Sequence, residues 1–156
     1  MMDALAARFE YQPDGRLVKK VTKQYGDTDI NRAGYRRVRW DRGTYGVVRV
    51  FAHRLVWFIH HGVLSDDVLV DHINGDYTDN RIENLRLVNK SGNSQNSVRR
   101  GYCKESRSGK YRAEITLNGK TKYLGLFGTA KEAREAYIAA KAILHECATA
   151  RTLKED

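Results

Sequence analysis

The stretch Val70-Asp71-His72-Ile73-Asn74-Gly75 places an acid and an imidazole side by side, directly after an aliphatic run. The aliphatic run predicts a strand, and Asn74-Gly75 predicts a turn immediately after it. Adjacent strand residues point to opposite faces, so Asp71 and His72 cannot both act from one regular face. We expect the turn to let one residue hold a cation while its neighbour faces a substrate.

The residues that follow complete a small unit around this pair. Residues 76–83 are polar and predict a loop, and residues 84–88 (Asn-Leu-Arg-Leu-Val) predict a second strand. Ser91 is a candidate N-cap for a helix that carries Asn93 and Asn96. The expected plan is therefore strand, loop, strand and helix, with the acid and the imidazole at its start and an amide on its last element.

Two hairpins and a helix are expected before this unit. Pro13-Asp14-Gly15 predicts the turn of a hairpin over residues 9–18, and Asp41-Arg42-Gly43 predicts that of a second over residues 35–50. Arginines fall on the wet face of the second hairpin, where DNA contact and simple solvation both remain open. Residues 52–61 then show helical spacing of apolar residues, with Gly62 as the stop.

The three histidines in that helix suggest the hypothesis of a metal site. The three are His53, His60 and His61, and zinc is the metal considered. His60 and His61 are neighbours and diverge by roughly 100° around a helix, so they cannot easily share one ion. Interaction of helix-end histidines with the C-terminal dipole is the preferred interpretation.

The C-terminal part predicts a three-stranded sheet covered by a helix. Asn118-Gly119, a hairpin turn signal, separates residues 111–117 from 122–127, and residues 101–104 supply the third strand. Thr129 and Glu132 have the spacing of a capping box. The helix that follows carries an apolar face suited to lie across the sheet, comprising Ala133, Ala136, Tyr137, Ala140, Leu144 and Cys147. Residues 151–156 are expected to be frayed.

Charge and composition restrict the class of partner. The net charge is +9, and residues 89–126 hold 9 Lys and Arg against 2 acidic residues. A basic stripe of this kind predicts nucleic-acid binding, because cations displace counterions from polyphosphate; a solvated charged face is the alternative. No apolar run reaches the ~20 residues of a membrane span. The N-terminus lacks a secretory pattern, and Cys103 and Cys147 support neither a disulfide framework nor a zinc knuckle.

An acid, an imidazole and a basic surface together indicate phosphodiester cleavage. That reaction needs an activated water and a cation that neutralises phosphoryl oxygens. Asp71 and Asn93 offer hard oxygen ligands of the type that Mg²⁺ and Mn²⁺ accept. His72 can take a proton from water near neutral pH, and Asn84 can bridge the loop backbone to hold it in place.

Residues 53–96 resemble the HNH endonucleases of the homing type common in phages. The resemblance lies in His53-Arg54-Leu55-Val56-Trp57, residues 71–75, residues 79–86 and Asn93-Ser94-Gln95-Asn96. It implies a ββα-metal fold with one divalent cation. It also implies Asp71 and Asn93 as the ligands, His72 as the general base and Asn84 as the structural asparagine. Asn93 stands where HNH members have a histidine, as in the HNN variant, which favours Mg²⁺ or Mn²⁺ over tightly held Zn²⁺.

Residues 100–137 resemble the AP2 DNA-binding domain. The resemblance lies in Arg100-Gly101, residues 109–115 and Tyr123-Leu124-Gly125, continuing through Thr129-Ala130 to Ala136-Tyr137. It implies that the sheet enters the major groove with the helix behind it. Four positions that are usually arginine in plant members differ here, namely Cys103, Glu105, Thr116 and Thr121. The expected DNA-binding residues are Arg99, Arg100, Lys104, Arg107, Lys110, Arg112, Glu114, Lys120, Lys122 and Tyr123.

The sequence therefore predicts an α+β protein with three parts. These are an HNH nuclease domain at 1–98 that opens with a small antiparallel sheet and a helix (core motif 53–96), an AP2-like three-stranded antiparallel sheet packed on one helix at 99–150, and a tail at 151–156. The expected function is metal-dependent, site-specific cleavage of double-stranded DNA by a monomer or weak dimer, as a nickase or double-strand cutter. The alternatives are a DNA-binding regulator with an inert HNH unit and a low-specificity phage nuclease. The expected location is the cytoplasm of a phage-infected or bacterial cell.

Overall fold

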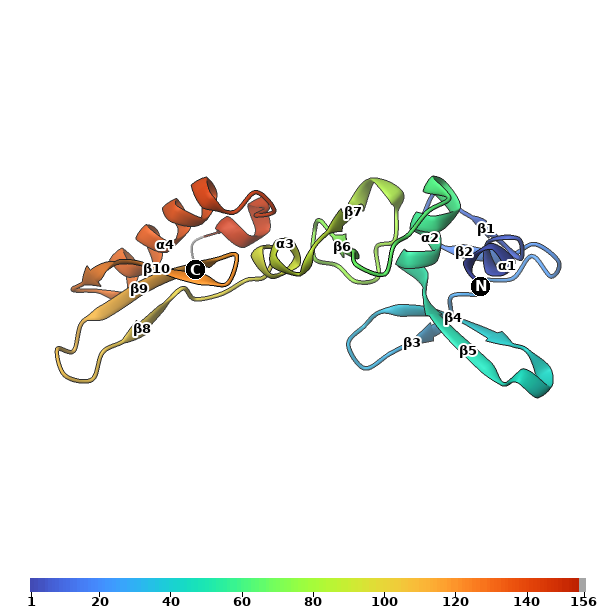
Figure 1. Cartoon of the computed structure of the whole chain (residues 1–156), viewed down its shortest axis with the longest axis horizontal. Coiled ribbons are helices and arrows are strands. Elements are labelled where there is room, and N and C mark those ends of the chain that lie inside the picture. Colours follow the sequence, from blue (N-terminus) through green and yellow to red (C-terminus); the bar gives the residue numbers. More distant parts are fainter. Residues whose placement is uncertain (155–156) are drawn as a thin grey trace. The chain divides into compact units, whose positions relative to one another are not determined.

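In the computed structural model the chain divides into two compact units, Met1–Leu87 and Val88–Asp156, and residues 1–154 are described. Both units combine helices with small antiparallel sheets, which confirms the α+β class (Figure 1). The division between the units falls inside a strand, β7 (Leu85–Val88). The domain limits expected from sequence, with a change at 98/99, stay a prediction.

The first unit opens with a short helix, α1 (Met2–Ala6), and the hairpin of β1 (Phe9–Tyr11) and β2 (Leu17–Lys19). The strands pair antiparallel, with Phe9 opposite Lys19, which confirms the first predicted hairpin. At its turn Gly15 has φ +84 and lies so close to the Asn80–Arg81 backbone that a Cβ would come within 2.5 Å of Arg81 N. The turn is therefore packed against the loop that follows Asp71 and His72.

The second predicted hairpin is also confirmed and gains a third strand. Its sheet runs β3 (Asp29–Ile30), β4 (Arg36–Asp41) and β5 (Val47–Phe51), with a 3₁₀ turn η1 (Gly43–Tyr45) between β4 and β5. Val38 and Val50 pair across the strands and are buried. Arginines occupy the opposite face and form ion pairs, Arg37 and Arg49 with Asp29, and Arg39 with Asp41.

Helix α2 (Ala52–His61) supplies much of the core of the first unit and ends, as expected, where Gly62 turns left-handed. Its buried residues, Ala52, His53, Leu55 and Val56, have helical spacing, and His60 and His61 at its end are exposed. A fully buried Leu contributes ~1.5–3 kcal/mol of hydrophobic stabilisation. The core comprises Leu5, Phe9, Leu17, Val38, Val50, Ala52, Leu55, Val56, Val70 and Leu85.

A two-stranded sheet brings the Asp71-His72 pair onto this core. Strand β6 (Leu69–His72) lies beside β7, and between them residues 73–84 form a polar loop that ends in the 3₁₀ turn η2 (Ile82–Asn84). The predicted strand, loop and strand are thus present.

The second unit contains the predicted three-stranded sheet and covering helix. The strands β8 (Tyr102–Lys104), β9 (Tyr111–Leu117) and β10 (Lys120–Phe127) are arranged in the order β10-β9-β8. Helix α4 (Ala130–Leu144) lies against the sheet and contacts all three strands (Figure 1). It begins with the predicted capping box of Thr129 and Glu132. Ala113 and Ile115 of β9 and Ala133 and Tyr137 of α4 are buried.

Three details of the second unit differ from expectation. Helix α3 (Lys90–Gln95) is capped by Asn89, whose side chain accepts from Gly92 N, rather than by Ser91. Helix α4 ends at Leu144, because His145 Nε2 reaches Thr116 O at 3.0 Å and the chain turns there, so Cys147 lies beyond the helix. The tail is ordered through η3 (Ala150–Leu153), where Thr152 is buried; residues 155–156 lie outside the described residues.

Long cationic side chains connect distant segments of the second unit by donating hydrogen bonds to backbone carbonyls. Arg134 donates to Arg99 O (2.6 Å) and Lys154 O (2.9 Å), and the fully buried Lys141 donates to Ser97 O at 2.8 Å. Burial lowers the pKa of Lys141 to about 8. No helix in residues 1–154 is both long and apolar enough to cross a bilayer.

Candidate active site

Asp71 and His72 end β6 and are both buried, with 8% and 2% of their surface exposed. The carboxylate Oδ2 of Asp71 accepts from Arg86 Nε (3.1 Å) and Nη2 (3.0 Å), and Arg86 belongs to the neighbouring strand β7. The imidazole of His72 instead contacts the loop and the aromatic residues described below. The two neighbours thus have separate surroundings, as the alternation of a strand requires.

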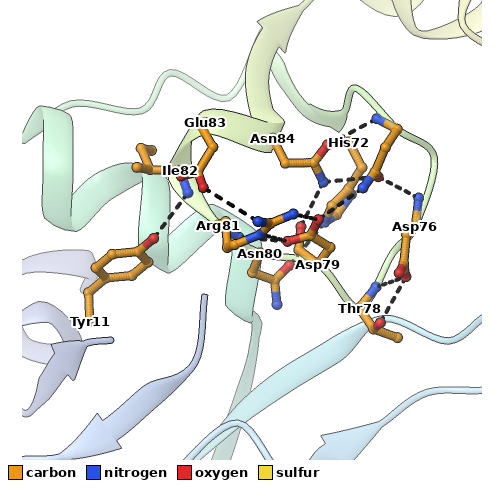
Figure 2. Close-up of polar contacts among 11 residues, drawn as sticks. Tyr11, His72, Asp76, Thr78, Asp79, Asn80, Arg81, Ile82, Glu83 and Asn84 are labelled. Atoms are coloured by element: carbon orange, nitrogen blue, oxygen red, sulfur yellow. Dashed lines mark hydrogen bonds and ion pairs between the residues drawn. The ribbon is translucent and has the colours of Figure 1, made fainter. Parts of the chain in front are cut away.

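Asn80 is a polar partner of the His72 ring. His72 and Asn80 lie side by side in the loop region (Figure 2). His72 Nε2 is 2.9 Å from Asn80 Oδ1, and Asn80 is 1% exposed. Burial lowers the pKa of His72 below its ordinary value, while the hydrogen bond to Asn80 and the nearby carboxylates of Asp71, Asp76 and Asp79 oppose that shift. A histidine that is neutral at pH 7 can accept a proton.

Asn84 ties the loop together through three hydrogen bonds. Its Nδ2 donates to Asp79 O (2.8 Å) and Asn74 Oδ1 (3.0 Å), and its Oδ1 accepts from Asn74 N at 3.0 Å. Asn84 therefore bridges the loop backbone, while the hydrogen bond to the His72 ring comes from Asn80. Its importance for catalysis stays a prediction.

Two acidic residues stiffen the same loop. Asp79 makes a two-point contact with Arg81 (Figure 2), at 2.8 Å from Nε and from Nη2. This pairing lowers the pKa of Asp79 to about 2. Asp76 accepts from Thr78 N and Thr78 Oγ1, and these bonds lower the pKa of Asp76. Tyr11 of β1 accepts from Ile82 N at 3.2 Å, which connects the first hairpin to the loop.

Aromatic rings surround His72 on its other sides. The ring of His53 lies 5.0 Å from that of His72, and Tyr35 stacks on Tyr77 with centroids 4.4 Å apart. Tyr35 is also 6.0 Å from His72. His53 is 6% exposed, and burial lowers its pKa to about 3. The sequence placed His53 among the helix histidines considered for a metal and within the HNH resemblance, but it did not indicate this contact.

Replacing His53 by Phe is expected to reduce the acid sensitivity of the first unit. The pKa of His53 is about 6.5 in the unfolded chain and about 3 in the folded one, so the unfolded state binds more protons between these values. Stability is full above pH 6.5 and falls by up to ~1.4 kcal/mol for each pH unit below it. Urea unfolding at pH 7 and pH 5, followed by fluorescence of Trp40 and Trp57, measures this loss.

Both tryptophans lie in the first unit, so their fluorescence reports on that unit alone. His61→Gln is the control, because His61 is an exposed histidine of the same helix. Its ring lies 4.1 Å from that of Trp57, so each variant is compared with its own folded and unfolded signals. An identical drop in stability from pH 7 to pH 5 in the parent and in His53→Phe contradicts the prediction.

The predicted metal ligands belong to different units. Asp71 lies in the first and Asn93 in the second, on α3, where Asn93 is exposed and donates its backbone N–H to Asn89 O. Helix α3 is fixed within its own unit, since Gln95 Oε1 accepts from Cys147 N. A carboxylate and an amide oxygen suit a hard divalent cation, so the donor chemistry fits Mg²⁺ or Mn²⁺. Within residues 1–154 no cluster of three or more His, Cys, Asp or Glu side chains is arranged to hold a metal.

The predicted DNA-binding residues all lie in the second unit, but on different faces. Register places Arg112, Glu114 and Tyr123 on the sheet face opposite the buried Ala113 and Ile115. The β9 residues of the helix-covered face instead pair with Lys104, Lys120 and Lys122. The structure therefore does not place all ten predicted DNA-binding residues on one face of the sheet. The exposed members are Arg99, Arg100, Lys104, Arg107, Lys110, Arg112, Lys120, Lys122 and Tyr123.

The sheet face that carries Arg112, Glu114 and Tyr123 has part of its positive charge neutralised, and it contains a hollow. Arg112 forms an ion pair with Glu114, and its guanidinium lies 5.6 Å from the Tyr123 ring. A hollow of about 670 Å³ extends from this face to Arg99 and the α3 residue Lys90. Cys103 lines it as well, so the exposed thiol belongs to the candidate binding surface.

Comparison with known proteins finds a family match over the first of these sites. Residues 50–95 match the family model described as HNH endonuclease, and this segment carries α2, β6, the polar loop, β7 and α3. This segment is thus similar to the HNH endonucleases, a family whose members generally use a divalent metal ion.

A solved structure of a particular member also matches. That structure is of the HNH homing endonuclease I-HmuI and is titled "DNA binding and cleavage by the HNH homing endonuclease I-HmuI". The two sequences are 26% identical, the match covers 57% of this chain and 51% of that chain, and the TM-score is 0.47. The chain therefore spans about half the length of that protein. The curated proteins contain no match.

Proposed function

We propose that this protein is a divalent-metal-dependent DNA endonuclease of the homing type. The observation that carries the proposal is the buried His72, which is hydrogen-bonded at 2.9 Å to Asn80 next to Asp71, inside the segment that matches the HNH endonuclease family. An imidazole kept neutral and oriented beside a carboxylate suits the activation of water at a phosphodiester.

In this proposal each residue has one task. His72 accepts a proton from the attacking water, Asn84 keeps the turn after β6 in shape, and Arg86 orients the Asp71 carboxylate. Asp71 and Asn93 would hold the divalent cation, which neutralises charge on the phosphate when bound. The expected products are a 3′-hydroxyl and a 5′-phosphate.

Cleavage of supercoiled plasmid and of long duplex DNA tests the proposal. We expect cutting with Mg²⁺ or Mn²⁺ and none when EDTA removes the cation, because phosphoryl charge is then not neutralised. Mapping the ends on both strands distinguishes a nick, expected of a monomer, from a double-strand break. Binding without cutting under every divalent ion would instead identify a DNA-binding regulator. Scattered ends would identify a low-specificity nuclease.

The second unit is proposed to select the DNA site in the manner of an AP2 domain. Support comes from its three-stranded sheet, its covering helix and the charge of +7 on residues 89–126. The exposed aromatic ring of Tyr123 beside Arg112 offers a base-contacting surface.

Removing two cations from the β8–β9 turn is expected to weaken DNA binding in a salt-dependent way. In Arg107→Ala/Lys110→Ala, each lost phosphate contact lowers the slope of log K against log salt by ~0.9. Fluorescence anisotropy with labelled duplex at several salt concentrations measures the slope. Lys131→Ala, an exposed cation on α4, is the control, and an equal slope change in both variants contradicts the prediction.

A further inference from the structure

Asn80 holds the imidazole that the proposed reaction depends on. Its Oδ1 lies 2.9 Å from His72 Nε2, and both side chains are almost fully excluded from solvent. An amide oxygen only accepts hydrogen bonds, so the ring nitrogen that faces it carries the hydrogen. In a neutral imidazole the other nitrogen, Nδ1, then has the lone pair.

We propose that Asn80 is a positioning residue that selects the Nε2–H tautomer of His72 and so makes Nδ1 the nitrogen that accepts the proton from water. This inference rests on the proposed function, in which His72 is the base. It assigns a role to one further residue and distinguishes two roles. Asn84 holds the loop together through its hydrogen bonds to Asn74 and Asp79, and Asn80 orients the imidazole ring of His72.

The surroundings of Asn80 indicate that its position is fixed for this contact. The turn at Gly15 packs against its backbone, where a Cβ would lie 2.7 Å from Asn80 C. Asp79 and Arg81, on either side, are tied to each other, and Asn84 bonds to Asp79 O. The amide oxygen is thereby held at a set distance from the β6 end.

The other end of the same side chain supports a functional role. Asn80 Nδ2 is buried and has no hydrogen-bond partner in the described part of the chain. An unsatisfied buried donor destabilises a fold, so Asn80 is a poor choice for stability alone. Its acceptor, directed at His72, is what the side chain contributes.

Nitrogen-15 NMR of the full-length protein at mildly alkaline pH reads the tautomer directly, without metal or DNA. We expect the parent to show protonated Nε2 and unprotonated Nδ1 at His72. Asn80→Ala is expected to lose this preference, and Asn80→Asp, which keeps an acceptor, to retain it. A parent spectrum with the hydrogen on Nδ1 overturns the inference.

Cleavage kinetics give the second readout. Loss of a group that orients a catalytic histidine costs ~10–10²-fold or more, so we expect Asn80→Ala to lower kcat by about that factor with KM unchanged and Asn80→Asp to restore most of it. Thr78→Ala, which alters the same loop through Asp76 only, should cleave like the parent. A parent-like kcat in Asn80→Ala overturns the inference.

The two failures are distinguishable. If His72→Ala cleaves like the parent, the proposed base is wrong, whatever the spectra show. If His72→Ala is inactive but the parent has the Nδ1–H tautomer, the base stands and the role of Asn80 is wrong. Thermal unfolding of each variant separates either result from loss of the fold.

Discussion

His72→Ala is expected to lower the rate of DNA cleavage by ~10²–10⁴-fold while leaving DNA affinity close to that of the parent. A positioned general base contributes about this factor, and the imidazole is buried against Asn80 beside Asp71. The second unit, which is proposed to bind DNA, lacks this residue. Single-turnover cleavage with Mg²⁺ and anisotropy binding on the same duplex separate the two effects.

Because His72 is 2% exposed, its truncation leaves a cavity and can weaken the fold. His72→Gln is therefore the second variant, since its amide can still donate to Asn80 Oδ1 but cannot accept a proton from water. Trp fluorescence shows whether the first unit remains folded. His61→Ala, an exposed histidine of α2, serves as the control. Parent-like cleavage by folded His72→Gln would exclude His72 as the base.

Local signals predicted the elements of this fold because their causes are local. Pro13-Asp14-Gly15 and Asn118-Gly119 predicted hairpin turns that are present, and Gly62 ends α2 in the left-handed conformation. The Thr129–Glu132 capping box depends on residues three apart and is formed as expected. The resemblance to HNH endonucleases also needed only short stretches, and the family match covers residues 50–95.

Contacts between distant segments set the features that the sequence left open. The end of α4 depends on the contact of His145 with Thr116, 29 positions earlier. The prediction from helical spacing did not include this contact and therefore wrongly placed Cys147 in the helix. The burial of Lys141 depends on Ser97 O, a contact 44 residues away. Neither partner is visible in a pattern with a period of 3.6 residues.

The same reasoning applies to the candidate site. Several asparagines follow Asp71-His72, and polarity alone cannot tell which one reaches the imidazole. The folding of residues 73–84 decides it: Asn84 turns towards Asn74 and Asp79, and Asn80 turns towards His72. His53 acquires its place beside His72 through the packing of α2 against β6.

Gly15→Ala is expected to destabilise the first unit strongly and to impair cleavage from outside the site. An L residue at φ +84 costs ~1–2 kcal/mol, and here the Cβ would also meet Arg81 N at 2.5 Å and Asn80 C at 2.7 Å. These are backbone atoms of the loop, so it must shift, which adds ~1–3 kcal/mol. The expected total is ~2–5 kcal/mol by urea unfolding followed through Trp40 and Trp57.

Gly34→Ala isolates the effect of the close approach. Gly34 has φ +92, yet a Cβ there would have nothing within 4 Å, so only the backbone strain of ~1–2 kcal/mol is expected. If the turn holds the loop in place, Gly15→Ala also lowers kcat when measured at a temperature where both variants are folded, and Gly34→Ala does not. Equal losses of stability and activity in the two variants would show that the β1–β2 turn does not support the loop that carries Asn80.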